Sequence, residues 1–234
     1  MTDYVLPPAK INSLMIVGKK ERFPVNRIIC VGRNYAAHAR EMGMDPSRIP
    51  PFFFMKPASA LVEANAEGVS IPYPPMTNNF HHEVELVLAI SKGGFNISAK
   101  TAWDHIYGYA VGLDMTRRDL QLDACSNRQP WEFGKSFSYS APIGPIHPAE
   151  QTGRMTKAAI SIEVNDKVRQ SSNIDQLTWS VPEIIEHLTR YERIQPGDLI
   201  MTGTPEGVSA VVAGDTMIGK IDGLGQIKVS VSGK

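Results

Sequence analysis

The sequence predicts an α+β fold that is rich in β-strands, arranged as a roll or a sandwich. Strand patterns outnumber helix patterns along the 234 residues, and most strands follow one another as hairpins instead of alternating with helices. A chain of this length supports one sizeable core, and we find no internal repeat or low-complexity segment in it. We expect a short N-terminal β appendage at residues 1–25 and one main domain at residues 26–234.

The N-terminal half contains hairpin, extended and helix patterns in turn. Residues 14–32 carry two β-branched runs around a polar turn at 18–21, which predicts a hairpin. The segment NYAAHAREMG predicts a short helix that ends at Gly43, and DPSRIPP after it predicts a loop. Ser98 is placed to cap a helix through Ile106, and TRRDLQLDAC predicts another helix. Extended segments are expected in PPFFFMKPASAL, GVSIPYP, HHEVELVLAI and YGYAVGLDMT.

The C-terminal half predicts a hairpin, one longer helix and two strands. In AAISIEVNDKVRQSS, Asn165–Asp166 occupies the turn of the hairpin. Ser180 followed by Pro182 indicates the start of a helix that runs toward Tyr191. The segments PGDLIMTGTPEGV and GQIKVSVSG predict strands with glycine-rich ends.

Charge and cysteine content exclude several classes of function. The chain has 24 basic and 24 acidic residues and no run of like charge, so we expect neither nucleic acid nor a membrane surface as a partner. Two isolated cysteines, Cys30 and Cys125, indicate a reducing compartment. The N-terminus MTDYVLPPAK lacks a signal-peptide pattern, and no apolar run approaches the roughly 18 to 20 residues that span a bilayer. We expect a soluble, cytoplasmic protein.

Two glutamates stand close together in the otherwise apolar strand pattern NNFHHEVELVLAI. Because strand side chains alternate with a period of two, Glu83 and Glu85 point the same way, about 7 Å apart along the backbone. Two buried like charges repel each other unless a cation lies between them. Oxygen ligands without cysteine suit Mg²⁺, Mn²⁺ or Ca²⁺. Asp114, where the YAVGL strand ends, is the best candidate for a third ligand.

The pattern by itself leaves a second interpretation of this strand. Glu83 and Glu85 also fit the exposed face of an edge strand that pairs with lysine or arginine. His81 and His82 precede the glutamates, but the spacing differs from the H-E-x-x-H of zinc proteases, so we interpret both histidines as structural. Three further acids fall on predicted helices, where solvent-exposed faces are expected: Asp104, Asp119 and Asp123.

A histidine and a glutamate stand three residues apart in GRNYAAHAREMG. On a helix this spacing brings His38 and Glu41 to one face within hydrogen-bonding reach. The carboxylate can then hold one ring nitrogen and leave the other as a base for water. Gly32 and Gly43 flank the segment and are compatible with a hinged lid. An ordinary contact on a surface helix fits the same spacing.

Two lysines interrupt apolar or aromatic surroundings, Lys56 in FFFMKPAS and Lys135 in EFGKSFS. A lysine there is costly unless its ammonium meets an anion, although snorkelling to solvent is the simpler alternative. The segment TGTPEGV at residues 202–208 offers hydroxyls and backbone amides that suit a carboxylate. It lacks the spacing of a phosphate-binding loop, so no nucleotide is implied.

These motifs together resemble a known family, the fumarylacetoacetate hydrolase family. The resemblance extends from about residue 28 to residue 210 and is closest to the short members that hydrolyse acylpyruvates, fumarylpyruvate among them. It implies a mixed β-sandwich roll of the fumarylacetoacetate hydrolase C-terminal type, a homodimer, and a Mg²⁺ or Mn²⁺ ion. The segments that carry it, in order, are CVGRNYAAHAREM, FFFMKPASA, HHEVELVLAI, GYAVGLDMTRRDLQ, PWEFGKSF and PGDLIMTGTPEGV.

The resemblance also implies roles for individual residues. The metal ligands are expected to be Glu83, Glu85 and Asp114. His38 and Glu41 fall on a water-activating pair of the lid. Lys135 is expected to take part in catalysis. The expected substrate contacts are Lys56, Arg118, Gln121, Gly203 and Thr204.

The expected reaction is hydrolysis of a C–C bond in a 2,4-dioxo acid, most simply fumarylpyruvate to fumarate and pyruvate, as in gentisate-type aromatic catabolism. Water deprotonated by His38 would add to the C4 carbonyl, and Lys135 or Gln121 would stabilise the oxyanion. The distal carboxylate needs a cation, for which Arg33, Arg118 and Arg128 are candidates. The alternatives are an oxaloacetate or 2-oxo-diacid decarboxylase or isomerase on the same scaffold, and a non-catalytic module that binds a dicarboxylate.

Overall fold

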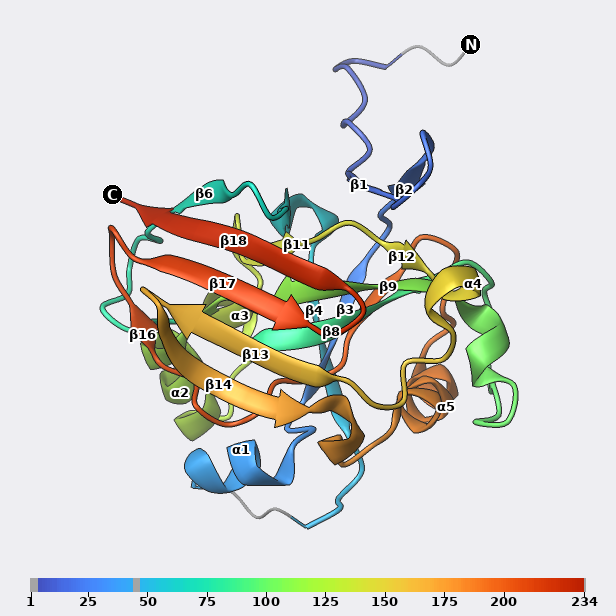
Figure 1. The fold of residues 1–234 in the computed structure, drawn as a ribbon. Coiled ribbons are helices and arrows are strands. Elements are labelled where there is room, and N and C mark those ends of the chain that lie inside the picture. Colours follow the sequence, from blue (N-terminus) through green and yellow to red (C-terminus); the bar gives the residue numbers. More distant parts are fainter. Residues whose placement is uncertain (1–3, 44–46, 234) are drawn as a thin grey trace.

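Two β-sheets packed against each other form the body of the molecule (Figure 1). The computed structural model describes residues 4–43 and 47–233. The larger sheet has the order β4-β3-β15-β8-β9-β11-β5, with β12 beside β9. Its strands are β3 (Ile28–Gly32), β4 (Phe52–Lys56), β5 (Leu61–Glu63), β8 (Val84–Ile90), β9 (Ile106–Leu113), β11 (Ala141–Ile143), β12 (His147–Pro148) and β15 (Leu199–Met201).

The second sheet has five strands in the order β14-β13-β17-β18-β6. They are β6 (Val69–Pro72), β13 (Ala159–Val164), β14 (Lys167–Asn173), β17 (Thr216–Ile221) and β18 (Gly225–Ser232). Two small sheets complete the β-structure, one of β1 (Ser13–Met15) with β2 (Arg22–Pro24) and one of β7 (Phe80–His81) between β10 (Thr116–Arg117) and β16 (Ala210–Val211). The predicted β-rich α+β fold is confirmed.

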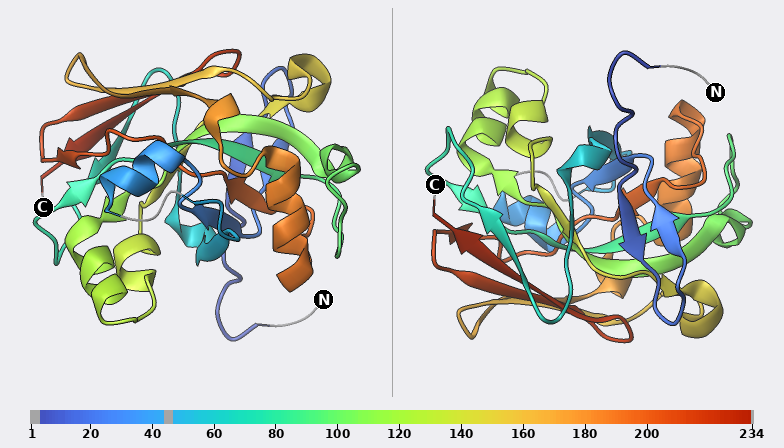
Figure 2. Two further views of the ribbon diagram at one scale, coloured as in Figure 1. Left: turned by 90° about the horizontal axis from the view of Figure 1, so that it is seen from below. Right: turned by 90° about the horizontal axis from the view of Figure 1, so that it is seen from above.

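Short helices lie at the two ends of the sheets, with α2 and α3 at one end and α4 and α5 at the other (Figures 1 and 2). None of the helices within residues 4–43 and 47–233 is long and apolar enough to cross a membrane. The α-helices are α1 (Ala36–Glu41), α2 (Arg118–Ser126), α3 (Glu132–Lys135), α4 (Ala149–Thr152) and α5 (Val181–Tyr191), and the 3₁₀ helices are η1 (Ala58–Ala60), η2 (Ala102–His105) and η3 (Ile174–Gln176).

Strand β8 separates two hydrophobic clusters. Its even-numbered residues from Val84 to Ile90 belong to the large cluster between the two sheets. Val87 and Ala89 point the other way, into a cluster that includes Leu14 and Phe23 of the β1–β2 hairpin. The strand is therefore buried on both faces, and the predicted alternation of its side chains is observed. The division into residues 1–25 and 26–234 stays a prediction.

Most predicted elements are present, and their local chemistry explains them. Asn165 and Asp166 both have positive φ, 49° and 61°, as the two-residue turn between β13 and β14 requires. Ser180 and Glu183 form a capping box at the start of α5. Helix α1 ends two residues before Gly43. Helix α2 covers the predicted TRRDLQLDAC segment except its first two residues, which form β10. The first two residues of the predicted loop DPSRIPP lie outside the described residues.

Two predictions of secondary structure need correction, and one helix was missed. The helix expected through Ile106 is only the 3₁₀ turn η2, because Ile106 already pairs with Ile90 as the first residue of β9. The hairpin expected over residues 14–32 closes at β2, and β3 leaves it to pair in parallel with β15. Helix α3 was not predicted.

Candidate active site

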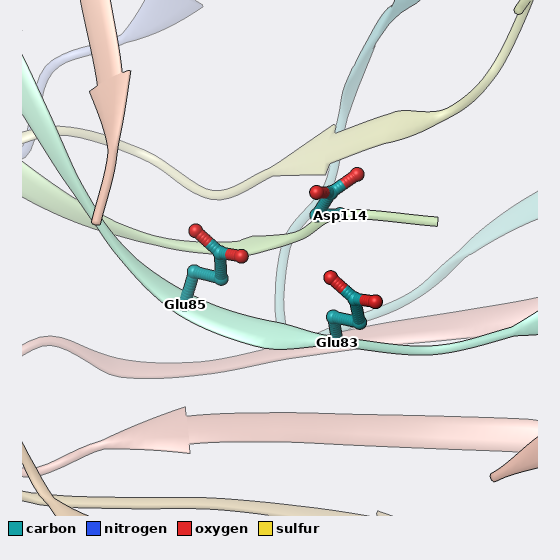
Figure 3. A group of neighbouring side chains, drawn as sticks. All are labelled: Glu83, Glu85 and Asp114. Carbon is teal, nitrogen blue, oxygen red and sulfur yellow. The ribbon is translucent and has the colours of Figure 1, made fainter. Parts of the chain in front are cut away.

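Three carboxylates converge where β8 begins and β9 ends (Figure 3). Glu83 immediately precedes β8, Glu85 lies on it, and Asp114 follows β9. The N–H of Asp114 donates to the carbonyl of Glu83 at 2.8 Å, which holds the two strand ends together. One oxygen from each carboxylate lies within 4.8 Å of the other two. The residues are only 4%, 2% and 1% exposed, and β8 lies between β15 and β9, so the edge-strand interpretation is wrong.

Buried cations neutralise two of the three carboxylates. The ammonium of Lys135 donates to Glu83 Oε2 at 2.8 Å and to Asp114 Oδ2 at 2.7 Å. Arg118 donates to the other oxygen of Glu83. Lys56 Nζ lies 2.8 Å from Asp114 Oδ1. Burial alone would raise the pKa of Glu83, but the charges of Lys135 and Arg118 outweigh it and hold that pKa well below its ordinary value.

Glu85 is in a different position. Among residues 4–43 and 47–233, no lysine or arginine forms an ion pair with Glu85. Its side chain accepts a hydrogen bond from the N–H of Gly203, which donates to Oε2 at 2.7 Å. Burial, and then the charges of Asp114 and Glu83, raise the pKa of Glu85 well above its ordinary value. The cluster therefore has one carboxylate whose charge lacks compensation.

This donor set fits a hard divalent cation. It offers carboxylate oxygens from three residues, with no sulfur or imidazole among the clustered atoms. Mg²⁺, Mn²⁺ and Ca²⁺ prefer such ligands. A cation bound by all three carboxylates would also supply the positive charge that compensates Glu85.

His38 and Glu41 form a pair beside this cluster. His38 Nδ1 lies 3.1 Å from Glu41 Oε2, as the three-residue spacing on α1 predicts. The other oxygen of Glu41 accepts a hydrogen bond from the N–H of Gly207 at 3.0 Å. His38 lines the same cavity as the three carboxylates. The imidazole therefore has one nitrogen held by a carboxylate and faces the cavity, which is the arrangement of a general base.

The comparison with known proteins identifies the family of this site. Residues 27–232 match the family described as "Fumarylacetoacetate (FAA) hydrolase C-terminal". The chain belongs to the fumarylacetoacetate hydrolase family. Its mixed β-sheet roll is that of a member of this family, as the sequence motifs indicated.

Similar members of the fumarylacetoacetate hydrolase family carry names that describe their activity. The chain is 49% identical over 188 residues to a fumarylpyruvate hydrolase from Ralstonia sp., covering 80% of this chain and 96% of that protein. It is 37% identical over 199 residues to the mitochondrial oxaloacetate decarboxylase of Dictyostelium discoideum, covering 85% and 89%. The crystal structure of fumarylpyruvate hydrolase from Pseudomonas aeruginosa in complex with Mn²⁺ and pyruvate superposes with a TM-score of 0.98 at 54% identity, covering 99% of this chain and 100% of that one.

Some of the predicted substrate-binding residues line the cavity and others lie outside it. Arg118, Gln121 and Thr204 line the cavity together with Lys135. Lys56 is absent from the lining and lies behind Asp114, where its ammonium also donates to the carbonyl of Met115 at 3.2 Å. Its geometry is that of a support for the Asp114 carboxylate, and contact of Lys56 with a substrate stays a prediction.

The TGTPEGV segment turns its polar groups inward. The Gly203 N–H is used by Glu85, and the Thr204 hydroxyl donates to the carbonyl of Val84 at 2.9 Å and accepts from Gln170 at 2.8 Å. Gln170 in turn accepts from the N–H of Val84 and lies 3.0 Å from His82. These contacts hold the start of β8 in place, and contact of Gly203 or Thr204 with a substrate stays a prediction.

Several residues at the site were not selected from the sequence. Phe54, Trp131 and Met42 give the cavity an apolar wall. Lys135 reaches the carboxylates because α3 packs closely on α2. A Cβ added to Gly134 of α3 would lie only 2.8 Å from the backbone nitrogen of Gln121 on α2. The aromatic residues around Lys135 in PWEFGKSF could have predicted the apolar wall of the cavity. The close contact between two short helices has no signal in the sequence.

Proposed function

We propose that this protein is a metal-dependent hydrolase that converts fumarylpyruvate and water to fumarate and pyruvate by cleaving the C3–C4 bond of the 2,4-dioxo acid. The observation that carries the proposal is that one cavity is lined by a compact cluster of three carboxylates and by the His38–Glu41 pair. The names of the similar proteins from Ralstonia and Pseudomonas support the same substrate.

His38 is the proposed base for the attacking water. With its Nδ1 proton directed to Glu41, the imidazole presents Nε2 as the proton acceptor. Glu41 also stabilises the imidazolium that forms when the proton is taken. The N–H of Gly207 keeps the Glu41 carboxylate oriented. The pair is therefore held by α1, which carries both residues, and by the loop that contains Gly207.

Lys135 and Gln121 each retain a donor for the oxyanion at C4. An ammonium has three N–H donors, and Lys135 uses two of them on Glu83 and Asp114. Gln121 accepts from Arg118 through its amide oxygen at 2.5 Å, so its NH₂ group is left to donate. Both residues line the cavity, and both would stabilise negative charge as water adds to the carbonyl.

Glu83, Glu85 and Asp114 would hold Mg²⁺ or Mn²⁺, and their oxygen ligands also suit Ca²⁺. When bound, the ion supplies the positive charge that lets the pyruvate fragment depart as an enolate. The proton that His38 has taken from water is then available for C3 of that fragment. The products fumarate and pyruvate account for all atoms of the substrate and one water.

The decisive experiment is to incubate the purified protein with Mg²⁺ and either fumarylpyruvate or oxaloacetate, and to measure pyruvate, fumarate and CO₂. We expect equal amounts of fumarate and pyruvate from fumarylpyruvate, dependent on His38. Rapid CO₂ release from oxaloacetate with no cleavage of fumarylpyruvate would instead support the decarboxylase activity named for the Dictyostelium relative. That activity requires no activated water, so it would persist without His38.

Three broader expectations belong to this proposal: a cytoplasmic location, a homodimer, and a role in the catabolism of aromatic compounds. Cys30 and Cys125 are both free thiols, as in a reducing compartment. The molar mass in solution, measured by light scattering, tests the homodimer against the 25.7 kDa of one chain.

A further inference from the structure

We infer that Arg33 binds the distal carboxylate of the substrate and makes the enzyme selective for dicarboxylic over monocarboxylic acylpyruvates. This inference rests on the proposed function and names the residue that recognises the far end of the substrate. The sequence left Arg33, Arg118 and Arg128 as equal candidates for this role.

The cationic side chains around the cavity differ in whether they already form an ion pair. Among the described residues that line it, the lysine and arginine side chains are Arg33, Arg118 and Lys135. Arg118 and Lys135 are both committed to the carboxylate of Glu83. Arg128 is exposed and does not line the cavity. Arg33 is therefore the lining guanidinium that remains for an anion from outside.

The guanidinium of Arg33 has a buried donor that lacks an acceptor. Its Nε is buried and has no hydrogen-bond partner, and Arg33 forms no ion pair with any acid within residues 4–43 and 47–233. A buried charged donor without an acceptor is costly. A carboxylate accepts two parallel hydrogen bonds from a guanidinium, so a dicarboxylic substrate supplies the missing acceptor.

The fold holds Arg33 in a specific and unfavourable position. Its φ is 62°, in the left-handed region that costs a residue with a side chain about 1 kcal/mol or more. The neighbouring Asn34 is fully buried and its side chain bonds to the carbonyls of Trp179 and Thr202 at 2.9 Å and 2.8 Å. These bonds fix the chain directly after Arg33, at the point where it leaves β3.

Phe52 positions the guanidinium from the other side. The guanidinium carbon of Arg33 lies 5.3 Å from the centre of the Phe52 ring, a cation–π contact. The ring lies against Gly32, where an added Cβ would come within 2.1 Å of it, and packs edge-on against Trp131 with centroids 4.9 Å apart. Backbone and aromatic contacts together thus hold a free cation at the cavity wall.

Arg33 also lines a second hollow that adjoins the catalytic cavity. The two share Gly32, Arg33 and Ala39, and the second is bounded by Phe52, Pro51 and Trp179. A substrate that carries a carboxylate at each end can place its pyruvyl end at the cluster of Glu83, Glu85 and Asp114 and extend its other end to Arg33. An acylpyruvate with a methyl group at that end has nothing to offer the guanidinium.

The test compares two substrates in two variants. We expect Arg33→Met to lower kcat/KM for fumarylpyruvate by about 10- to 100-fold, the range for loss of a charged hydrogen bond, and to leave acetylpyruvate cleavage within about twofold. Arg128→Met is the matched control and should change neither value. An equal fall for both substrates in Arg33→Met, or none for either, overturns the inference.

A binding measurement keeps the test independent of turnover and of any folding defect. By calorimetry in the presence of Mg²⁺, the wild type should bind fumarate more tightly than crotonate, its monocarboxylic counterpart, and Arg33→Lys should retain part of that preference while Arg33→Met loses it. A preserved preference in Arg33→Met contradicts the inference. If the wild type cleaves neither acylpyruvate, the proposed function fails instead, so the two failures are distinguishable.

Discussion

Glu85 accepts its hydrogen bond from the N–H of Gly203 at 2.7 Å, across 118 residues of sequence. Gly203 has a φ of 99°, and a Cβ there would come within 2.7 Å of Asn34. The loop after β15 therefore approaches the carboxylate with backbone alone, in a conformation that favours glycine. This contact orients Glu85 without neutralising it, which leaves its charge to be compensated by a cation.

Replacing Glu85 with glutamine should separate metal binding from stability. We expect Glu85→Gln to weaken Mg²⁺ binding by more than tenfold, because one of three anionic ligands is lost. In the presence of chelator the variant should be at least as stable as the wild type, since it relieves the repulsion from Asp114 and Glu83. Calorimetric titration with Mg²⁺ and thermal melts in EDTA measure the two effects, and unchanged Mg²⁺ affinity would refute the ligand assignment.

Asp114→Asn is expected to behave differently, although it removes the same charge. Asp114 pairs with both Lys56 and Lys135 while only 1% exposed. Its neutralisation leaves buried ammonium groups short of a partner, which costs about 3–5 kcal/mol. In EDTA, urea unfolding should therefore show a clear loss for Asp114→Asn and none for Glu85→Gln. Equal stability of the two variants would contradict this account of the cluster.

His38→Ala should impair chemistry and spare the metal site. Removing a positioned general base costs about 10²- to 10⁴-fold in rate, so kcat for fumarylpyruvate should fall by that order. Metal content, measured by elemental analysis, should stay at the wild-type value, because the hydrogen bond of His38 goes to Glu41 and the three carboxylates themselves are left unchanged. Full activity in the variant would show that another group activates the water.

Gly207→Ala tests the support of Glu41. The added Cβ would lie 2.0 Å from the carbonyl oxygen of Arg169, so the loop must shift and its N–H must leave Glu41. We expect kcat to fall by about tenfold, since misplacement of about 1 Å can cost up to 10²-fold. Gly214→Ala is the matched control, because Gly214 has a similar φ of 97° and open space around it. It should lose a similar backbone stability and keep full activity. Equal kcat in the two variants would show that the N–H of Gly207 does not support the His38–Glu41 pair.

Stability should decline on acidification through the range in which His81 titrates. Burial, and next the charge of Arg118, lower the pKa of His81 from 6.5 to about 4. Between these values the unfolded chain binds a proton that the folded protein does not, so the free energy of unfolding falls as the pH is lowered from 6.5 to 4. In chelator, the urea midpoint of His81→Asn should fall less over this range than that of the wild type. Parallel curves would show that His81 does not contribute.

Local spacing was enough to predict several parts of the fold and of the site. Glu83 and Glu85 share a face because a strand alternates with a period of two, and His38 reaches Glu41 because helical residues three apart are neighbours. The turn at Asn165–Asp166 and the cap at Ser180 follow from the chemistry of those side chains alone. Such features depend on backbone geometry over a few residues, which the sequence specifies directly.

Contacts between distant segments were decided only by the tertiary structure. Lys56 and Lys135 had the same apolar surroundings in sequence, yet one lies behind Asp114 and the other lines the cavity. Arg33, Arg118 and Arg128 were indistinguishable until the fold committed Arg118 to Glu83 and left the Nε of Arg33 without a hydrogen-bond partner in the described part of the chain. The sequence determined which groups could carry charge in this protein, whereas the pairing of those charges depends on which strands and helices meet, and that follows from the packing of the whole core.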